Sequence, residues 1–327
     1  MITSAENSTP TSKTPARGST EFELGNTEFE LRHGAYVAAV TLRGAALRSL
    51  RHEGRDLVVP FAPGKTIPDY RGVICAPWPN RLADGRYSWE GADIQVPINE
   101  PERNTALHGL VFDILWSVAE RDESSVTLAT SLTPGEGYPF PLDLKVRYSL
   151  SPAGLQGTVT AANPGSASVP YGVCPHPYLI AGSAPLDDWS LAIPADRFLD
   201  VTPDRLLPTE EVPVEGHDFD FRTEKVLGSR RIDHAFSGIS RDAGGIAKVS
   251  VFDPSGTGVE LAWGNEWPWV QIHTGDKPAG PDRLGVAVEP MTCPPDAFNS
   301  GTDLVQLAPG QVHSASWSIQ AVRRFAA

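Results

Sequence analysis

The chain has 327 residues, with 27 Lys or Arg against 40 Asp or Glu, which gives a net charge of −13. An acidic chain of this kind lacks the basic surface that nucleic acids require and the polybasic anchor that anionic membranes attract. Hydrophobic residues make up 40% of the chain, enough for a sizeable core, while 30 Gly and 30 Pro disfavour long helices. The composition therefore indicates a globular protein of short strands and many turns.

Residues 1–20 are rich in Ser, Thr and Pro and contain little to bury, so we expect a disordered tail there. They show neither the pattern of a secretory signal nor, like the rest of the chain, the ~18 apolar residues of a membrane span. Cys75, Cys174 and Cys293 are an odd, widely spaced set, which favours reduced, buried thiols over a disulfide framework. We expect a soluble, cytoplasmic protein.

Short apolar runs separated by turn residues follow from residue 21 onward. Several alternate apolar and polar residues with a period of two, which is typical of strands with one buried face. The predicted strands span 35–42, 86–89, 126–130, 144–150, 157–161, 248–252, 269–273, 285–289 and 314–319.

The order of these elements also narrows the fold class. The sequence shows no amphipathic helix of three turns, no regular alternation of strands and helices, and no repeat of 20–50 residues. No Gly-rich linker divides the chain after the tail. We therefore predict a single all-β domain over 21–327, built as a large antiparallel β-sandwich.

Two polar segments in the first half could carry chemistry. In the first, two prolines stiffen a loop that presents Asn80 and Arg81 side by side, and together these side chains can read neighbouring hydroxyl groups. A simpler interpretation is that Arg81 pairs with a carboxylate. In the second, His108 precedes Gly109, a residue that allows close approach of the backbone, although a lone His is more often a structural hydrogen-bonding group.

Two further segments offer an acid and a base. His176 lies between Pro175 and Pro177, which hold it on an extended, stiff segment, unless it is an ordinary histidine at a protected sheet edge. Glu289 closes an apolar strand, where burial of a carboxylate is costly without a partner; the alternative is a solvated strand end, since Pro290 interrupts the ladder. Asp233 and Gln271 are two further candidate polar residues of a site. Judged alone, Asp233 is more simply interpreted as a turn residue and Gln271 as an outward-facing strand residue.

Taken together, these segments resemble the aldose 1-epimerase (galactose mutarotase) family. The resemblance runs from about residue 80 to 290 and rests on six short motifs in order: Asn80-Arg81, Leu107-His108-Gly109, His176-Pro177-Tyr178, residues 232–236, Gln271 followed by Thr274-Gly275, and Glu289-Pro290. It implies the fold of a β supersandwich, a small-molecule sugar as the partner, and an isomerase that needs no cofactor and no metal.

By the same resemblance, His176 is the general acid and Glu289 the general base of ring opening. The implied substrate-binding residues are Asn80, Arg81, His108, Tyr178, Asp233 and Gln271. An unperturbed Glu is ionised at neutral pH and an unperturbed His is mostly neutral. We therefore expect Glu289 or Asp233 to lie near His176 and to favour its protonated form.

Three other functions remain open at this stage. Asp233 and Glu289 could serve as the carboxylate pair of a glycoside hydrolase or lyase. Trp263, Trp267 and Trp269 could form the platform of a non-catalytic carbohydrate-binding protein, although core packing is the simpler interpretation. His108, His176, His273 and Glu289 could bind a metal ion, although no short ligand spacing supports this.

Overall fold

The computed structural model describes residues 28–277 and 282–324. Within these ranges almost all regular structure is strand, and the sheets are antiparallel, which confirms the all-β prediction. The predicted tail over 1–20 lies outside the described residues, so the division into a tail and one domain over 21–327 remains a prediction.

The largest sheet has nine strands, and the long C-terminal strand β27 lies inside it, between β13 and β23. The order is β10 (Ser117–Arg121), β11 (Ser125–Leu132), β12 (Leu142–Ser151), β13 (Gly154–Ala162), β27 (Val312–Arg323), β23 (Thr257–Trp263), β22 (Ala247–Phe252), β17 (Ser190–Ala192) and β20 (Lys225–Val226). β12 and β13 alternate buried and more exposed residues, as their period of two predicts.

A second sheet has six strands and carries much of the pocket described below. Its order is β16 (Tyr178–Leu179), β25 (Val286–Met291), β24 (Trp269–His273), β21 (Asp233–Ile239), β18 (Ala195–Val201) and β19 (Pro208–Pro213). All six residues of β25 are buried, so this strand has no solvent face.

The remaining elements are short. A four-stranded sheet contains β1 (Glu28–His33), β2 (Tyr36–Thr41), β3 (Leu47–His52) and β4 (Arg55–Asp56). Four two-stranded ladders pair β14 (Val169–Tyr171) with β26 (Val305–Leu307), β15 (Cys174–Pro175) with β5 (Ile74–Cys75), β6 (Arg81–Ala83) with β9 (Thr105–Leu107), and β7 (Arg86–Trp89) with β8 (Ala92–Gln95). The helices are η1 (Pro68–Tyr70), η2 (Leu186–Asp188) and α1 (Ala297–Ser300).

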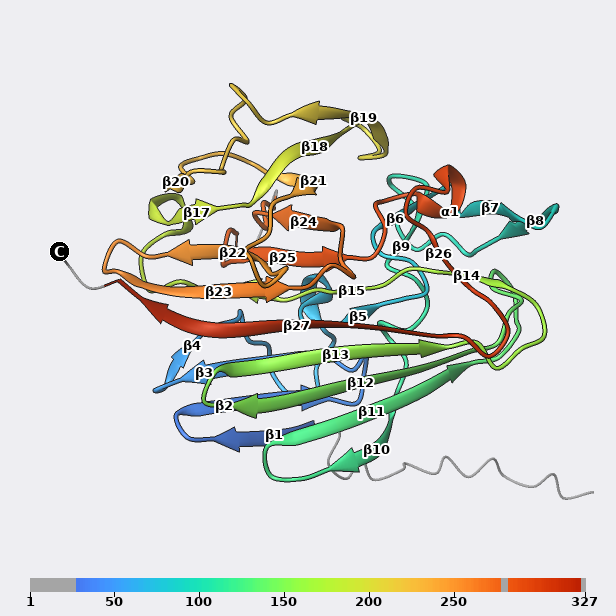
Figure 1. The fold of residues 1–327 in the computed structure, drawn as a ribbon, viewed down its shortest axis with the longest axis horizontal. Coiled ribbons are helices and arrows are strands. Elements are labelled where there is room, and N and C mark those ends of the chain that lie inside the picture. Colours follow the sequence, from blue (N-terminus) through green and yellow to red (C-terminus); the bar gives the residue numbers. More distant parts are fainter. Residues whose placement is uncertain (1–27, 278–281, 325–327) are drawn as a thin grey trace, which may run out of the picture.

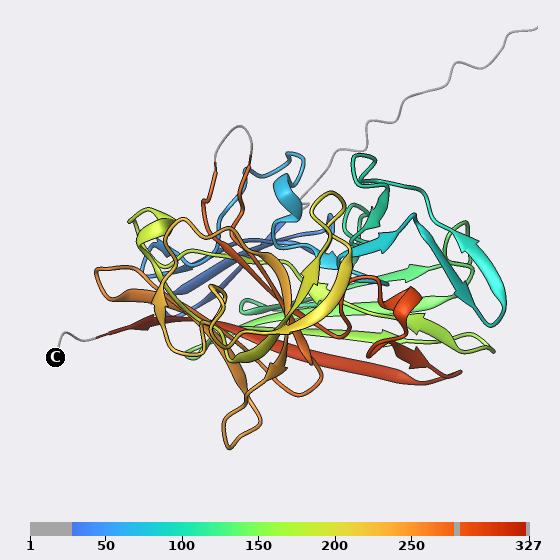
Figure 2. The same ribbon diagram turned by 90° about the horizontal axis from the view of Figure 1, so that it is seen from above.

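The sheets stack as a sandwich. Figure 1 shows the long strands β11, β12, β13 and β27 crossing the molecule, with β24 and β25 above them and β18 and β19 at the top. β1 and β2 pack against β12, and Figure 2 shows the same layers from above. One large cluster of buried apolar side chains connects the layers, and burial of apolar area is the main favourable contribution to their packing.

Each predicted strand overlaps an observed one. The predicted spans 86–89 and 269–273 coincide with β7 and β24, and the others begin or end within a few residues of the observed strands. No helix of the described residues is long and apolar enough to cross a membrane.

Candidate active site

The predicted site residues come together at one pocket of about 380 Å³. Its wall is mostly polar and includes Asn80, Arg81, His108, His176, Tyr178, Asp233 and Glu289. Gln271 lies directly behind this wall, where its Nε2 donates a 2.7 Å hydrogen bond to Asp233 Oδ1. Residues up to 209 positions apart in the sequence, from Asn80 to Glu289, therefore share one cavity.

His176 sits on a rigid stretch of backbone between β15 and β16. Its N–H donates to Val73 O at 3.1 Å, and its carbonyl accepts from Gly72 N–H at 2.7 Å. Tyr178 stacks on the imidazole, with ring centroids 5.3 Å apart. The side chain is buried, and its Nδ1 has no hydrogen-bond partner among the described residues. The ring is thus held firmly, with Nε2 directed to Glu289.

Glu289 differs from the strand end that Pro290 suggested. β25 continues through Pro290, which pairs with Val270, and ends only at Met291. Glu289 is 1% exposed and lies opposite Gln271 in the ladder. The solvated alternative is therefore wrong: the carboxyl group belongs to the buried floor of the pocket.

The two groups meet directly. His176 Nε2 lies 3.3 Å from Glu289 Oε1. Burial, and then the charge of Asp233, raise the pKa of Glu289 well above its usual value. Burial also lowers the pKa of His176 to about 3, and nearby His273 adds to this effect.

These directions correct the expected protonation of His176. A carboxyl group does lie beside the ring, but burial raises the pKa of this carboxyl group and so disfavours the carboxylate that would raise the pKa of the imidazole. The shifts favour a neutral imidazole beside a protonated carboxyl group. Relative to a neutral imidazole and a carboxylate, the pair then carries one additional proton, the same number as an imidazolium beside a carboxylate.

Asp233, at the start of β21, is a second acidic group close to Glu289 in the pocket. Burial opposes ionisation of its carboxyl group, but the charges of His273 and Arg81 and the hydrogen bond from Gln271 outweigh burial and lower its pKa. Its Oδ2 lies 3.8 Å from Arg81 Nη1. The pKa of Asp233 is therefore lowered and that of Glu289 raised, so the two carboxyl groups favour opposite charge states in one pocket.

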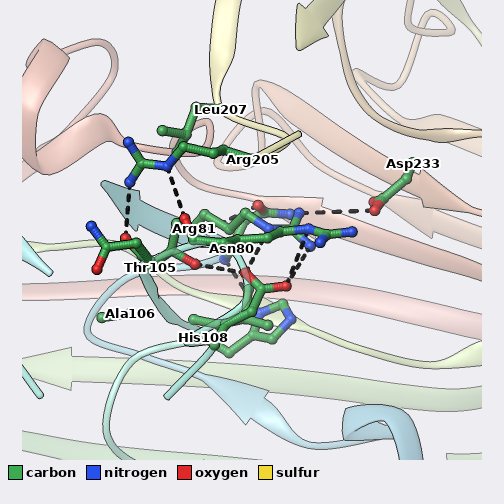
Figure 3. Close-up of polar contacts among 12 residues, drawn as sticks. Asn80, Arg81, Thr105, Ala106, His108, Arg205, Leu207 and Asp233 are labelled. Atoms are coloured by element: carbon green, nitrogen blue, oxygen red, sulfur yellow. Dashed lines mark hydrogen bonds and ion pairs between the residues drawn. The ribbon is translucent and has the colours of Figure 1, made fainter. Parts of the chain in front are cut away.

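Arg81 is less free than its sequence context implied. Its Nε and Nη2 donate to the two carboxylate oxygens of Glu100 at 2.9 and 3.0 Å, and Thr105 Oγ1 donates to the same carboxylate at 2.6 Å. Figure 3 shows Arg81 with Asp233 to one side of its guanidinium group and His108 below. The simpler interpretation of Arg81 is therefore confirmed, since it pairs with a carboxylate. Arg81 also lines the pocket, and its contact with sugar hydroxyls stays a prediction.

His108 has a defined tautomer. Its Nδ1 lies 3.3 Å from the backbone N–H of Asn80, which can only donate, so the ring proton is on Nε2. Burial lowers the pKa of His108 well below its usual value, so the ring is neutral. Gly109 is required beside it: its φ is +75°, and a Cβ there would lie 2.1 Å from Ala76 O.

Several pocket residues were not predicted from the sequence. Glu100 fixes Arg81, and Tyr70, on η1, covers both histidines, with ring centroids 4.6 Å from His108 and 6.3 Å from His176. Cys174 Sγ donates to Glu289 Oε2 at 3.7 Å. Nothing in the local sequence marks Glu100 or Tyr70, because their roles arise from contacts across loops.

The structure also bears on two alternatives. Trp263, Trp267 and Trp269 are at most 3% exposed and belong to the core, so they form no exposed platform for sugar rings. Within the described ranges, His108, His176 and Glu289 place ligand atoms within 4.8 Å of one another, but His273 does not join such a group.

Comparison with known proteins finds similarity over most of the chain. The family model of aldose 1-epimerase matches residues 27–320. The uncharacterized protein YihR of Escherichia coli is 34% identical over 95% of this chain and 99% of its own length, and pig galactose mutarotase is 26% identical over 86% and 89%. The crystal structure of a galactose mutarotase-like protein from Clostridium acetobutylicum covers 91% of this chain and 95% of its own, with a TM-score of 0.79 at 21% identity. The chain belongs to the aldose 1-epimerase family.

Proposed function

We propose that this protein is a mutarotase, which interconverts the α and β anomers of a hexose such as galactose or glucose without a cofactor. The observation that carries the proposal is the 3.3 Å contact between His176 and Glu289 on the floor of a polar pocket. Family membership supports the same reaction class. The three free, buried cysteines suit a reducing, cytoplasmic setting.

The reaction requires one proton donor and one proton acceptor. His176 delivers a proton to the ring oxygen as the bond from that oxygen to C1 breaks, and Glu289 receives the proton of the anomeric hydroxyl as C1 becomes an aldehyde. After rotation about the bond from C1 to C2, the ring closes on the other face and both protons return. The pair therefore begins and ends the cycle with one proton.

The pKa directions specify how the cycle starts. Before the reaction the shared proton is favoured on Glu289, so it must cross the 3.3 Å contact to His176 for the imidazole to act as the acid. This transfer involves no net change in charge on the pair. Positioned acid and base groups typically contribute ~10²–10⁴ each, which suffices for a reaction whose spontaneous rate is already appreciable.

The other pocket residues hold the sugar hydroxyls. Neutral His108 offers its Nε2 proton, ionised Asp233 offers acceptor oxygens, and Arg81 offers the protons of Nη1. Asn80, Tyr178 and Gln271 complete the proposed substrate-binding set. Gln271 Oε1 is buried without a partner among the described residues, so it retains an acceptor position.

Polarimetry with freshly dissolved α-D-galactose and α-D-glucose tests the proposal. We expect the protein to accelerate the approach to anomeric equilibrium, and equally so in the presence of a chelator. No acceleration with any aldose in a panel would contradict the proposed function. Release of reducing sugar from oligosaccharides would instead favour a glycoside hydrolase that uses Asp233 and Glu289.

We expect Asp233→Asn to act mainly on binding. The change keeps the side-chain shape but removes a charged acceptor, and hydrogen bonds to charged groups are worth about 1.5–3 kcal/mol, which corresponds to a rise of roughly 10–100-fold in KM. kcat should fall less. Steady-state polarimetry separates the two constants, and Asp113→Asn, at an exposed ion pair with Arg43, is the control. A fall in kcat with unchanged KM would contradict the binding role.

A further inference from the structure

A pair of cysteines lies directly beneath the pocket. Cys75 on β5 and Cys174 on β15 are partners in an antiparallel ladder, so their side chains emerge on the same face. Both are fully buried and both are free thiols. Two thiols held side by side in this way form the beginning of a site for a soft cation.

His108 completes a set of three ligands. One ligand atom each from Cys75, His108 and Cys174 lie within 4.8 Å of one another. His108 Nδ1 accepts a hydrogen bond from the backbone N–H of Asn80, so Nε2 carries the ring proton in the metal-free protein. Nε2 binds a cation after this proton moves to Nδ1 and the hydrogen bond from Asn80 is given up. Zinc bonds of ~2.3 Å to sulfur and ~2.0–2.1 Å to nitrogen place tetrahedral ligand atoms roughly 3.5–3.8 Å apart, so shifts of about 1 Å would close the set.

The fourth ligand position has a candidate in Glu289. Its Oε2 lies 3.7 Å from Cys174 Sγ, a separation suited to two ligands of one tetrahedral ion. The Glu289 carboxyl group also lines the pocket, so a cation can approach from the pocket side. The set of two thiolates, an imidazole and a carboxylate fits Zn²⁺ or Cd²⁺ and discriminates against Mg²⁺, which prefers oxygen ligands in an octahedron.

We propose that Cys75, His108 and Cys174 form a binding site for a thiophilic divalent cation, and that a cation bound there inhibits the enzyme. Binding replaces the two thiol protons, which are released to solvent, with two metal–sulfur bonds, and the His108 proton moves from Nε2 to Nδ1. When Glu289 becomes the fourth ligand, its carboxyl proton is also released to solvent. It takes His108 away from the sugar and draws Glu289 away from His176. The inhibition rests on the proposed function, but the binding does not.

The three cysteines provide a matched test. Cd²⁺ is titrated into the reduced protein, with heat measured by calorimetry and thiolate-to-cadmium charge transfer followed by ultraviolet absorption. We expect one Cd²⁺ per chain and a charge-transfer band in the wild type and in Cys293→Ala, which removes an equally buried cysteine outside the set. Cys75→Ala and Cys174→Ala should each weaken binding by at least about 100-fold, since even loss of an outer contact to a metal ligand costs 10–100-fold.

The outcomes separate this site from its alternatives. Absence of the charge-transfer band in the wild type, or equal weakening by Cys293→Ala, overturns the proposal. Inhibition by Cd²⁺ that persists unchanged in Cys174→Ala also overturns it, because the cation would then bind to His108, His176 and Glu289. Thermal unfolding shows which variants are folded. If only one of Cys75→Ala and Cys174→Ala folds, its Cd²⁺ affinity and the charge-transfer band of the wild type are sufficient to test the site. A wild type that binds Cd²⁺ but never accelerates mutarotation supports the site and contradicts only the proposed function.

Discussion

Glu289→Gln is expected to slow the mutarotation of galactose by ~10²–10⁴-fold while the protein remains folded. The amide keeps the size of the carboxyl group, but it cannot accept the proton of the anomeric hydroxyl. It also cannot hold the proton that Glu289 shares with His176 across 3.3 Å. Polarimetric kcat is the measurement, and the effect should appear in kcat far more than in KM.

The same substitution is expected to stabilise the protein at alkaline pH. The folded-state pKa of Glu289 is raised, so the stability linked to its proton is complete below its unfolded pKa of about 4.5 and is lost as pH rises through the folded pKa. Gln does not titrate and escapes this loss. The Tm difference between variant and wild type should therefore grow in favour of the variant as pH rises.

Glu260→Gln is the matched control for the predicted loss of mutarotation in Glu289→Gln. Glu260 is also buried, on β23, where its carboxylate accepts hydrogen bonds from Ser250 and Gln320. It is not among the residues that line the pocket. We expect normal mutarotation from this variant. Near-normal activity in Glu289→Gln, or equal losses in both variants, would refute the role of Glu289.

His176→Asn should cause a comparable loss of kcat, again by ~10²–10⁴-fold. Asn preserves a polar side chain near Glu289 but offers no group that gains and loses a proton. Polarimetry is again the measurement, and His313→Asn, at a histidine on β27 outside the pocket lining, is the control. Retention of more than about a tenth of the wild-type kcat would exclude His176 as the acid.

The pH dependence of stability gives His176→Asn a second signature. The folded-state pKa of His176 is about 3, below the ordinary value of 6.5, so its contribution is complete above pH 6.5 and is lost as pH falls toward 3. Asn has no such loss. Between these limits, acidification should therefore lower the Tm of the wild type more than that of the variant; the opposite trend would contradict the buried, neutral imidazole.

Strands with only one buried face were predictable because such burial produces an alternation of apolar and polar residues in the local sequence. β12 and β13 have one face in the core, so the alternation of apolar and polar residues in their sequences predicts two strands. β25 is buried on both faces, and its sequence Val-Ala-Val-Glu-Pro-Met has no such period. The prediction ended this strand at Glu289 because Pro290 was expected to interrupt the ladder, but the ladder continues to Met291.

The residues of the candidate site were predictable through their short motifs, but their interactions were not. Arg81 and Glu100 are 19 positions apart and form a two-bond ion pair in the folded chain, where Glu100 bridges to Thr105 on β9 and β9 pairs with β6. The sign of the His176 shift was mispredicted for a related reason. The contact with Glu289 was predicted, but the extent of burial depends on every layer around the pair, and burial is the largest cause of both pKa shifts.

The position of β27 has a consequence for how the protein is made. β27 pairs with β13 on one side and with β23 on the other, so it joins the two halves of the nine-stranded sheet. A ribosome synthesises this strand after both of its neighbours. Until residue 323 has left the exit tunnel, β13 and β23 therefore each present an uncovered edge, the kind of surface that recruits other unfinished chains. Slow translation of the codons for β27 would prolong this exposure and increase the need for chaperones while β27 is being synthesised.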